Sequence, residues 1–511
     1  MMNRRCLAML GVFALILTLT ACDSERARPV ETQPVKIGFI VAGERPTYLR
    51  SAQLAVDEIN DSGGLFGRPV ELVSLVNPEA SLPLTIQAAE RMIVDDHVIA
   101  IIGPNRSTHA VEVGPIAQGY GVPMVTTAAS NPRVTEAGDF VFMASVTDTF
   151  QGRVMAQFAR DDLAVRTVAL LTLSGDVYTE GISEFFAANF TDLGGTVVEE
   201  AYFDAGTTDF TAQLAAIAAL RPDAFFISSF IRGIAAITRQ ARAIPMRNAA
   251  GEPTLFLGTD TWDSDVLLAD EDAELEGSFF TTHFSPDTDE PAARAFIEAY
   301  QAAYGAVPSG GDAVNYDAVR LLYEAIERAG SLDPEAIREQ LQATEHYAGA
   351  TRIARYDANR HPAKSSVILT IEDGEKQFYR QIDPPRGRVV IDDDAGQGRD
   401  RWGTDPYELS AATIMGDTLT VTVSYSGGCE THRFTLVASN VFLESYPVQL
   451  GASLAHDANG DSCERWVTED WDFDLTPIRW MYQDAYRQDA GTIILRLEHA
   501  PEPSLVYEFM L

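Results

Sequence analysis

Strand and helix signals alternate from Val35 to about Ile382, and this alternation constrains the fold more than any other feature of the sequence. Residues 35–41 form a short apolar run typical of a strand, and Ser51–Asn60 follows with apolar residues at helical spacing. The alternation continues through predicted strands at 70–73, 98–102, 123–126, 167–172, 196–199, 224–227 and 254–257. Repeated strand–helix units fold into a parallel sheet with helices on both faces, so we expect an α/β fold here.

The length of the chain indicates more than one folded unit. With 511 residues it is longer than a single ordinary domain. The alternating part alone, at roughly 350 residues, is longer than one such sheet needs. We therefore expect two lobes in residues 35–382, each built on a parallel sheet flanked by helices.

The sequence changes character at about Pro384. Thr418–Tyr425 alternates apolar and polar residues with period two, which is typical of a half-buried antiparallel strand. Similar patterns occur at 433–437, 492–497 and 506–511, whereas helical periodicity is scarce. We expect a mainly-β C-terminal domain at 388–511, joined to the α/β part by the Pro- and Gly-containing segment 383–387.

The N-terminal segment is typical of an export signal. Arg4 and Arg5 precede an apolar stretch at 7–19, which is too short for a stable membrane span. The stretch ends in Leu19-Thr20-Ala21-Cys22, which resembles a bacterial lipobox, the motif in which the cysteine receives fatty acyl chains such as palmitate. This resemblance implies that residues 1–21 are removed and that Cys22 is acylated. The alternative is an ordinary export signal with an incidental cysteine.

A lipid-anchored form would stay at the membrane, because two acyl chains hold a protein stably where one does not. Asp23 resembles the residue that retains lipoproteins at the inner membrane of enteric-type bacteria, and the polar segment 22–34 would serve as a tether. We expect the folded part in the periplasm, anchored to the outer face of the inner membrane.

Charge and motifs exclude several functions. The chain carries 74 acidic against 38 basic residues, a formal charge of −36, which repels nucleic-acid backbones and anionic lipid surfaces. No lysine follows a glycine, so a phosphate-binding Walker A loop is absent from the sequence. The sequence also contains no HExxH zinc motif and no Gly-x-Ser-x-Gly nucleophile turn. We expect no nucleic-acid partner, no enzymatic activity and no cofactor.

Several short motifs follow one another in order between residues 35 and 380. They are Val35–Gly38, Ala52–Gly67, Ile101–Pro104, Asn105–Thr108, Tyr178–Gly181, Thr208–Phe210, Tyr316–Ala318 and Gly349–Asn359. Together they resemble the type I periplasmic solute-binding proteins of the branched-chain amino acid class. The resemblance implies two αβ lobes that are joined by three crossing strands and close on a ligand in the cleft.

The resemblance also implies lobe limits and partners. The first lobe would comprise 35–149 and 279–345, and the second 150–278 and 346–382. The ligand would be a small molecule, an amino acid or a relative, which the protein would deliver to an ABC permease. An envelope sensor or scaffold with the same fold is the alternative. The C-terminal domain lies outside the resemblance and receives no role from it.

Two serines are candidate contacts for a ligand carboxylate. Ser107 follows a predicted strand and precedes an apparent helix, where a serine is a natural N-cap. A helix N-terminus with free amides binds carboxylates readily. The resemblance implies that Ser107 holds the α-carboxylate of an amino acid and that Ser130 is a second contact. A capping serine and a polar turn, respectively, remain the alternatives.

Three residues of the second lobe complete the expected site. The resemblance implies that Tyr178 is a ligand-facing aromatic residue and that Asp260 pairs with the ligand ammonium. Phe230 stands where the family often has tyrosine, so it keeps an apolar wall but lacks a hydroxyl. Asp260 could instead cap the segment after Gly258. A zwitterion with an uncharged side chain is the expected ligand.

The loop at 41–49 departs from the family. Instead of a longer glycine-rich loop, the chain has Ala42-Gly43-Glu44-Arg45-Pro46-Thr47-Tyr48. Because this loop lines the side-chain pocket in the family, the identity of the ligand does not transfer. Arg45 and Arg106 are near the expected site in sequence, and an acidic ligand side chain therefore remains open.

The cysteines and one acidic segment bear on the C-terminal domain. Cys6 would leave with the signal, so Cys429 and Cys463 remain in an exported β-rich domain, where a disulfide is expected. Two buried free thiols are the alternative. Asp457–Asp461 is similar to a calcium loop, but its glycine comes too early and Thr468 occupies position twelve, so we expect a polar turn and no metal.

Overall fold

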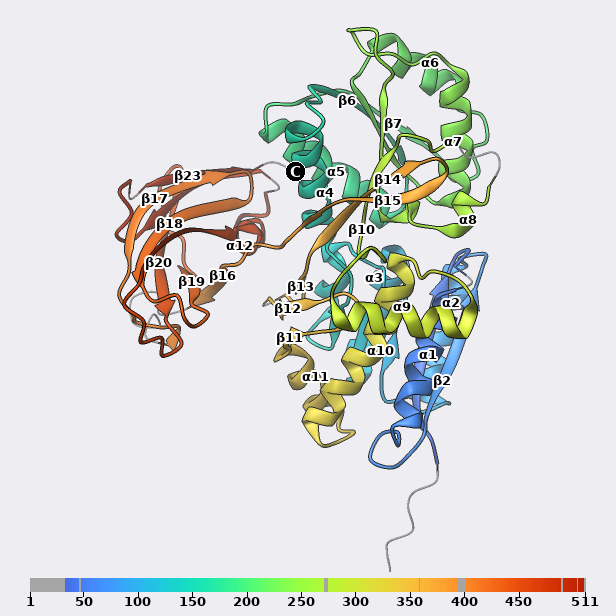
Figure 1. Ribbon diagram of the computed structural model, residues 1–511, viewed down its shortest axis with the longest axis horizontal. Helices are drawn as coiled ribbons and strands as arrows, with labels where there is room; N and C mark the ends of the chain where they lie inside the picture. The colour runs from blue at the N-terminus through green and yellow to red at the C-terminus, as the bar shows by residue number, and fades with distance from the viewer. Residues whose placement is uncertain are drawn as a thin grey trace, which may run out of the picture.

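The structure is a computed structural model, and it consists of two αβ lobes with a β-rich domain beside them (Figure 1). It describes residues 33–45, 47–270, 274–357, 359–392, 401–488, 490–502 and 504–509. The expected signal peptide, the expected acylation site Cys22 and most of the expected tether lie outside these residues. The two-lobed α/β fold is confirmed, and so is the mainly-β C-terminal domain.

The first lobe is built on a parallel five-stranded sheet in the order β2-β1-β3-β4-β5. Its strands are β1 (Val35–Ala42), β2 (Val70–Asn77), β3 (Ile101–Ile102), β4 (Met124–Thr126) and β5 (Val141–Met143). Its helices are α1 (Tyr48–Asp61), α2 (Leu82–Val94), α3 (Ser107–Tyr120), α9 (Pro291–Tyr304), α10 (Gly310–Ala329) and α11 (Pro334–Gln342). Apolar side chains of α1 and α10 cover one face of the sheet, and those of α2 and α3 cover the other.

The second lobe is built on a seven-stranded sheet in the order β15-β14-β10-β9-β8-β6-β7. Its strands are β6 (Thr167–Leu173), β7 (Thr196–Phe203), β8 (Ala224–Ser228), β9 (Leu255–Gly258), β10 (Phe279–Thr282), β14 (Ser366–Glu372) and β15 (Glu375–Ile382). Its helices are α4 (Asp148–Asp161), α5 (Val177–Asp192), α6 (Thr211–Leu220), α7 (Ile231–Ala243) and the short α8 (Asp265–Leu268). The strands β6 to β10 are parallel, and β14 and β15 add an antiparallel edge.

The chain changes lobe at positions that differ from two expected limits. Residues 279–282 were expected in the first lobe, but β10 pairs with β9 and β14 in the second-lobe sheet. Residues 346–363 were expected in the second lobe, but Tyr347, Ile353 and Tyr356 pack in the core of the first lobe. The first difference arises because β10 pairs with β14 along its whole length, and with β9 over part of it, before the chain crosses to the first lobe. The segment 345–363 forms a separate sheet of β11 (Glu345–Tyr347), β12 (Ile353–Tyr356) and β13 (Pro362–Ala363).

The C-terminal domain packs a five-stranded sheet, ordered β16-β19-β20-β22-β23, against a three-stranded sheet, ordered β17-β18-β21. Its elements are β16 (Arg388–Asp392), β17 (Glu408–Met415), β18 (Thr418–Ser426), β19 (Arg433–Ser439), β20 (Val448–Asp457), β21 (Trp466–Asp474), α12 (Thr476–Tyr486), β22 (Gly491–Leu497) and β23 (Leu505–Phe509). The four predicted strand segments are found as β18, β19, β22 and β23, whereas the helix α12 was not predicted.

The C-terminal domain contacts both lobes. Arg153 of α4 donates a hydrogen bond to the hydroxyl of Thr418 at the start of β18. The Trp480 ring of α12 packs edge-on against His361, with the ring centroids 5.1 Å apart. Since His361 bonds to Thr135 of the first lobe, the domain spans the region where the lobes join.

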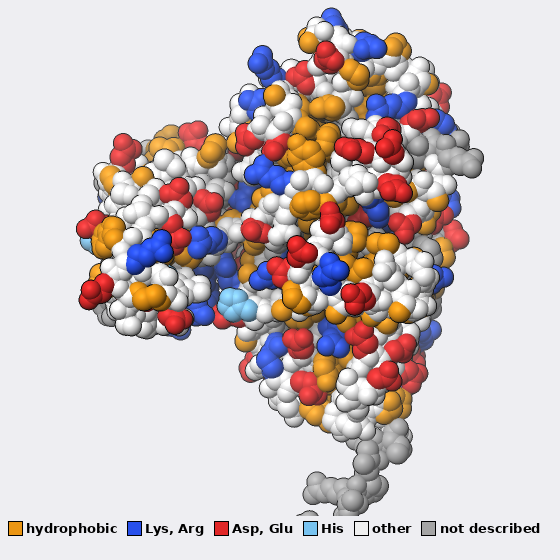
Figure 2. Space-filling model, viewed as in Figure 1, with side chains coloured by type: hydrophobic (Ala, Val, Ile, Leu, Met, Phe, Trp, Pro, Cys, Tyr) orange, Lys and Arg blue, Asp and Glu red, His pale blue; other side chains and the backbone are white. Residues whose placement is uncertain are grey.

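Acidic and basic side chains are interspersed on the face of the molecule shown in Figure 2. Among the residues that the structure describes, no helix has the length and apolar character needed to cross a membrane.

Candidate functional site

A cavity of about 640 Å³ lies between the two lobes. From the first lobe it is lined by the β1–α1 loop and the start of α3, and from the second lobe by the starts of α5 and α7 and the segment after β9. These segments all follow strands at their carboxyl ends, which is where open αβ sheets bind ligands. The volume falls within the range of roughly 300–1,000 Å³ that is usual for small-molecule sites.

Ser107 lies at the wall of this cavity and is buried. The expectation that it is the N-cap of its helix is wrong by one residue, because α3 begins at Ser107 and Arg106 is the capping position. The Ser107 hydroxyl accepts a hydrogen bond of 3.2 Å from the amide of Asn131 instead. No side chain caps α3, so its first amides remain available to an anion at the cavity wall.

Ser130 is fully buried and does not line the cavity. Its hydroxyl has no hydrogen-bond partner among the described residues, while its carbonyl accepts a 2.9 Å bond from the Asp148 amide. Burial raises the pKa of the Asp148 carboxyl well above its usual range. Ser130 therefore lies behind the cavity wall, next to the residue that donates to Ser107, and not at the wall itself.

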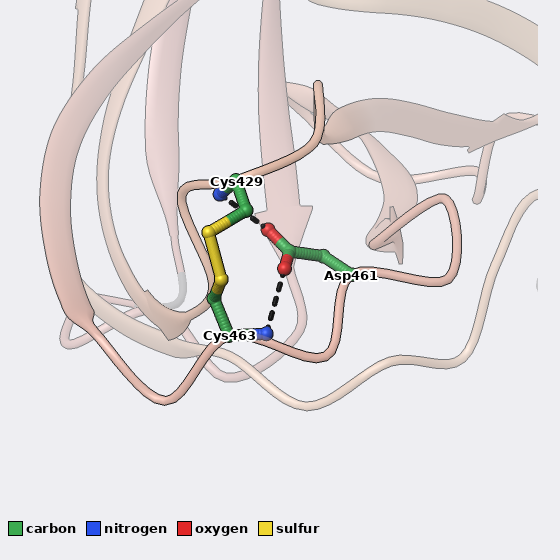
Figure 3. A group of neighbouring side chains, drawn as sticks. All are labelled: Cys429, Asp461 and Cys463. Carbon is green, nitrogen blue, oxygen red and sulfur yellow. Dashed lines mark hydrogen bonds between the residues drawn. A yellow bond between two sulfur atoms is a disulfide. The ribbon is translucent and has the colours of Figure 1, made fainter.

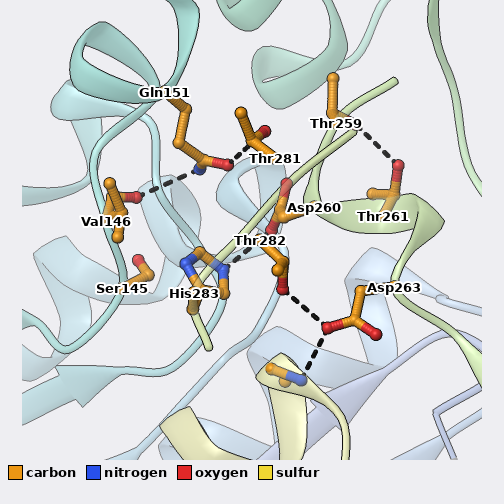
Figure 4. A network of polar contacts seen from close by, with 12 residues as sticks. Ser145, Val146, Gln151, Thr259, Asp260, Thr261, Asp263, Thr281, Thr282 and His283 are labelled. Carbon is orange, nitrogen blue, oxygen red and sulfur yellow. Dashed lines mark hydrogen bonds and ion pairs between the residues drawn. The ribbon is translucent and has the colours of Figure 1, made fainter. Parts of the chain in front are cut away.

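Asp260 lies at the cavity wall on the second lobe, and its carboxylate has two partners, of which Figure 4 shows His283. The Tyr178 hydroxyl donates to Oδ1, and His283 Nε2 lies 3.0 Å from Oδ2. Burial, reinforced by the charge of Asp260, raises the pKa of Tyr178 well above its usual range, so the phenol keeps its proton as a donor. Among the described residues, no backbone amide donates to Asp260, which argues against the alternative of a capping role.

His283 is a site residue that the sequence reasoning missed. It follows β10 directly and has a side chain that is 2% exposed, against 7% for Asp260. The position of a polar residue at the carboxyl end of a second-lobe strand could have indicated it. The strand itself, with the sequence Phe279-Phe280-Thr281-Thr282, had not been recognised as part of that sheet.

Arg106 and Phe230 form the wall between the lobes. The Arg106 guanidinium carbon lies 3.5 Å from the centroid of the Phe230 ring, a cation–π contact. The Phe230 ring in turn lies 6.1 Å from the Tyr178 ring, measured between centroids. Burial lowers the pKa of the Arg106 guanidinium; the charge of Asp176 opposes this shift, and that of Arg45 adds to it.

Hydrogen bonds connect the lobes across the cleft. The Thr108 hydroxyl donates to Asp176 Oδ2 at 2.9 Å and accepts from the Val177 amide at 3.0 Å. Arg45 donates to the carbonyl of Thr261 at 3.2 Å. At the rim, Arg232 of the second lobe forms an exposed ion pair with Glu44 of the first. The two lobes are thus in contact around the cavity.

In the C-terminal domain, Cys429 and Cys463 are joined by a disulfide (Figure 3). Asp461 lies beside it and accepts hydrogen bonds from the amides of Gly428, Cys429, Glu430 and Cys463. The three side chains are close enough to hold a metal ion, but the two sulfurs are bonded to each other. The acidic segment acts here as the polar turn that we expected, with Asp461 fixing the loop.

The chain matches the sequence profile of the family described as periplasmic binding protein over residues 35–376. It belongs to this family. Our periplasmic binding protein is 28% identical over 335 residues to the Leu/Ile/Val-binding protein BraC3 of Rhizobium johnstonii, an alignment that covers 64% of this chain and 88% of that protein.

Solved structures agree with this assignment. The leucine-binding protein LivK of Thermotoga maritima is 35% identical to this periplasmic binding protein, with a TM-score of 0.63, covering 68% of this chain and 99% of that one. The protein LivJ of Streptococcus pneumoniae, solved in complex with isoleucine, is 26% identical with a TM-score of 0.62, covering 69% and 100% of the two chains. The fold is therefore that of a type I periplasmic binding protein of the branched-chain amino acid class, and the family match ends before the C-terminal domain.

Proposed function

We propose that this protein is an extracytoplasmic solute-binding lipoprotein that captures a small zwitterion, an amino acid, by closure of its two lobes. It would deliver this ligand to an ABC permease and would act by binding, without a chemical step. The observation that carries the proposal is the cavity between the lobes, with the uncapped start of α3 on one side and Asp260 on the other. A helix N-terminus and a carboxylate are complementary to the two charges of a zwitterion.

Each expected site residue has a role in this proposal. The Ser107 hydroxyl and the amides at the start of α3 would bind the ligand carboxylate, and Asp260 would bind the ammonium. Tyr178 and Phe230 would form the wall around the ligand, and Ser130 would support Ser107 from behind. The relatives described as binding leucine, isoleucine and valine support an amino acid as the ligand.

Isothermal titration calorimetry with a panel of amino acids tests the proposal. The protein should first be unfolded and refolded to remove any ligand that co-purifies, and that ligand should be identified by mass spectrometry. We expect at least one amino acid to bind with a dissociation constant in the micromolar range or below. If no amino acid binds to the refolded protein, the proposed function is wrong.

The lipid anchor is a separate part of the proposal. Cys22 lies outside the described residues, so the lipobox sequence alone supports acylation at this position. We expect Cys22→Ala to move the protein from the membrane fraction to the soluble periplasmic fraction of the native host. A variant that remains with the membranes would contradict the lipid anchor but not the binding function.

The C-terminal domain favours one alternative, an envelope sensor or scaffold. It lies outside the family match and contacts the region between the lobes through Trp480 and His361. Uptake of a labelled amino acid by host cells with and without this gene distinguishes the two functions. Loss of uptake supports transport, whereas binding in vitro without any change in uptake supports the sensor.

A further inference from the structure

The charged groups that line the cavity differ in whether they have partners. Asp260 is held by Tyr178 and His283, as described above. Asp176 caps α5 by accepting from the amides of Tyr178 and Thr179, and it also accepts from a threonine hydroxyl of the first lobe. Glu79 is exposed at the rim. Inside the cleft, Asp260 and Asp176 are therefore both held by hydrogen bonds, and neither forms an ion pair with an arginine among the described residues.

The basic lining groups are not all engaged. Arg232 is paired with Glu44 at the rim. Arg45 donates to one carbonyl oxygen, and Arg106 stacks on Phe230. Neither Arg45 nor Arg106 forms an ion pair with any residue in the described parts of the chain. Two of the three cavity arginines thus have no carboxylate at ion-pair distance among the described residues, although the charge of Asp176 acts on Arg106.

Arg106 lies at the cavity wall, between the β1–α1 loop and the second lobe. Its guanidinium faces Phe230 of the second lobe, and a Cβ added at Gly43 of the β1–α1 loop would lie 3.6 Å from Arg106 Nε. It therefore occupies the space between that loop and the second lobe. Burying a cation is costly, and burial lowers the pKa of Arg106 even though the charge of Asp176 opposes the shift, so this cost is only partly compensated. An anion in the cavity would relieve it.

Two helix N-termini add to the positive potential. The starts of α3 and α7 both line the cavity, and neither has a side-chain cap. Each carries the partial positive charge of a helix N-terminus. The lining holds three arginines and four carboxylates, so the positive charge is local to the two uncapped helix starts and to the two arginines that form no ion pair.

We propose that the cleft selects an amino acid whose side chain carries a carboxylate, and that Arg106, assisted by Arg45, binds this second carboxylate. The planar guanidinium suits the task because it can donate two parallel hydrogen bonds to a carboxylate. This inference rests on the proposed function and specifies its ligand class as dicarboxylic amino acids. It replaces the uncharged side chain that was expected from the sequence.

Calorimetry with matched pairs of ligands tests the inference. L-Glutamate and L-glutamine have nearly the same shape and differ in the side-chain charge, and L-aspartate and L-asparagine form a second pair. At low ionic strength the refolded wild-type protein should bind the acidic member of at least one pair ten times or more tighter than its amide. L-Leucine serves as a third, apolar probe.

Two variants of Arg106 and one control test whether this residue causes the preference for acidic ligands. In Arg106→Gln the preference for the acidic ligand over its amide should fall to less than threefold. The reason is that the side chain substituted at position 106 carries no positive charge. Arg106→Lys should retain part of the preference. Arg352→Gln is the matched control, since it removes an exposed arginine that pairs with Glu290 away from the cavity, and it should leave the acid-to-amide ratio unchanged. Thermal unfolding confirms that each variant is folded.

The outcomes separate this inference from the proposed function. If L-leucine or an amide binds as tightly as the acids, the inference is wrong and the proposed function stands. If Arg106→Gln keeps the wild-type preference, Arg106 is not the selecting residue and the inference is wrong. If no amino acid binds to the wild-type protein, both the inference and the proposed function fail.

Discussion

His283 Nε2 lies 3.0 Å from Asp260 Oδ2, so a histidine that follows β10 holds the carboxylate at the cleft from behind. The Tyr178 hydroxyl holds the other oxygen of the same carboxylate. A charged group whose position is fixed by two neighbours loses little conformational freedom when a ligand binds. Asp260 is therefore held in one position at the cavity wall, as the proposed ammonium site requires.

Asp260→Ala should weaken ligand binding about 30-fold or more. Removing one partner of a charge pair in a closed, desolvated cleft costs about 2–5 kcal/mol, and each 1.4 kcal/mol corresponds to tenfold in affinity. The measurement is calorimetry with the amino acid that the wild-type protein binds most tightly. His283→Gln is the companion variant, and it should weaken binding less because the aspartate remains. Unchanged affinity in Asp260→Ala would contradict the ammonium site.

Ser107→Ala should weaken binding by less than tenfold. The hydroxyl already accepts a bond from the Asn131 amide, and the first amides of α3 remain in place without it. A loss below about 1.4 kcal/mol is therefore expected from the same calorimetric measurement. A loss larger than that of Asp260→Ala would mean that the hydroxyl, rather than the helix start, dominates carboxylate binding.

The alternation of strands and helices predicted the two lobes. The spacing of apolar residues within each element reflects which side chains are buried, and this spacing can be read from the sequence alone. The site was predicted less completely. Ser107, Tyr178, Phe230 and Asp260 line the cavity, whereas Ser130 lies behind it. Whether a residue lines the cavity or lies behind its wall depends on how segments that are far apart in the sequence pack together. His283 meets Asp260 only through the pairing of β10 with β9.

The C-terminal domain was harder to predict for a related reason. Its sheets pair segments that are far apart in the chain, such as β16 with β19. The alternation of apolar and polar residues therefore predicts where strands occur but not the order in which they pair. The helix α12 begins with Thr476-Pro477 and buries only part of one face. Its buried residues Ile478 and Tyr482 lie four apart on one face and pack in the core of the domain.

The protein should lose stability as the pH falls from 6.5 towards 4, in part through His109. Burial, followed by the charge of Arg106, lowers the pKa of His109 from 6.5 to about 4. Between these pH values the unfolded chain binds a proton at this residue that the folded chain does not, so acid favours unfolding. The contribution of the neutral His109 side chain to the free energy of unfolding is therefore fully present above pH 6.5 and is lost as the pH falls towards 4.

Urea unfolding at pH 7 and pH 4.5 measures this effect. The wild-type protein should lose about 2 kcal/mol more than His109→Gln between the two conditions, since one pKa unit corresponds to about 1.4 kcal/mol. The variant controls for the carboxylates, which titrate in both proteins. Equal losses would show that His109 is not responsible.

Asp417→Ala should destabilise the C-terminal domain by about 3 kcal/mol. The Asp417 carboxylate lies 2.7 Å from the Arg479 guanidinium and accepts from the Tyr507 hydroxyl, and the Arg479 side chain is 5% exposed. The substitution would leave this cation buried without its partner. Asp470→Ala is the control, because Asp470 is exposed and accepts one bond from Thr422. Thermal unfolding followed by tryptophan fluorescence should separate the two variants clearly.

Removal of the Cys429–Cys463 disulfide should also destabilise this domain, by about 3–4 kcal/mol for a loop of this length in the chain-entropy description. The bond closes a segment with a sequence separation of 34 residues, and Asp461 holds the same loop through four backbone amides. Those amide bonds should preserve the folded loop, so the loss arises in the unfolded chain. Calorimetric unfolding of the Cys429→Ser/Cys463→Ser double variant should show a lower midpoint for the C-terminal domain and an unchanged midpoint for the ligand-stabilised lobes. If the midpoint of the domain does not move, Asp461 and the core are sufficient to hold the loop without the bond.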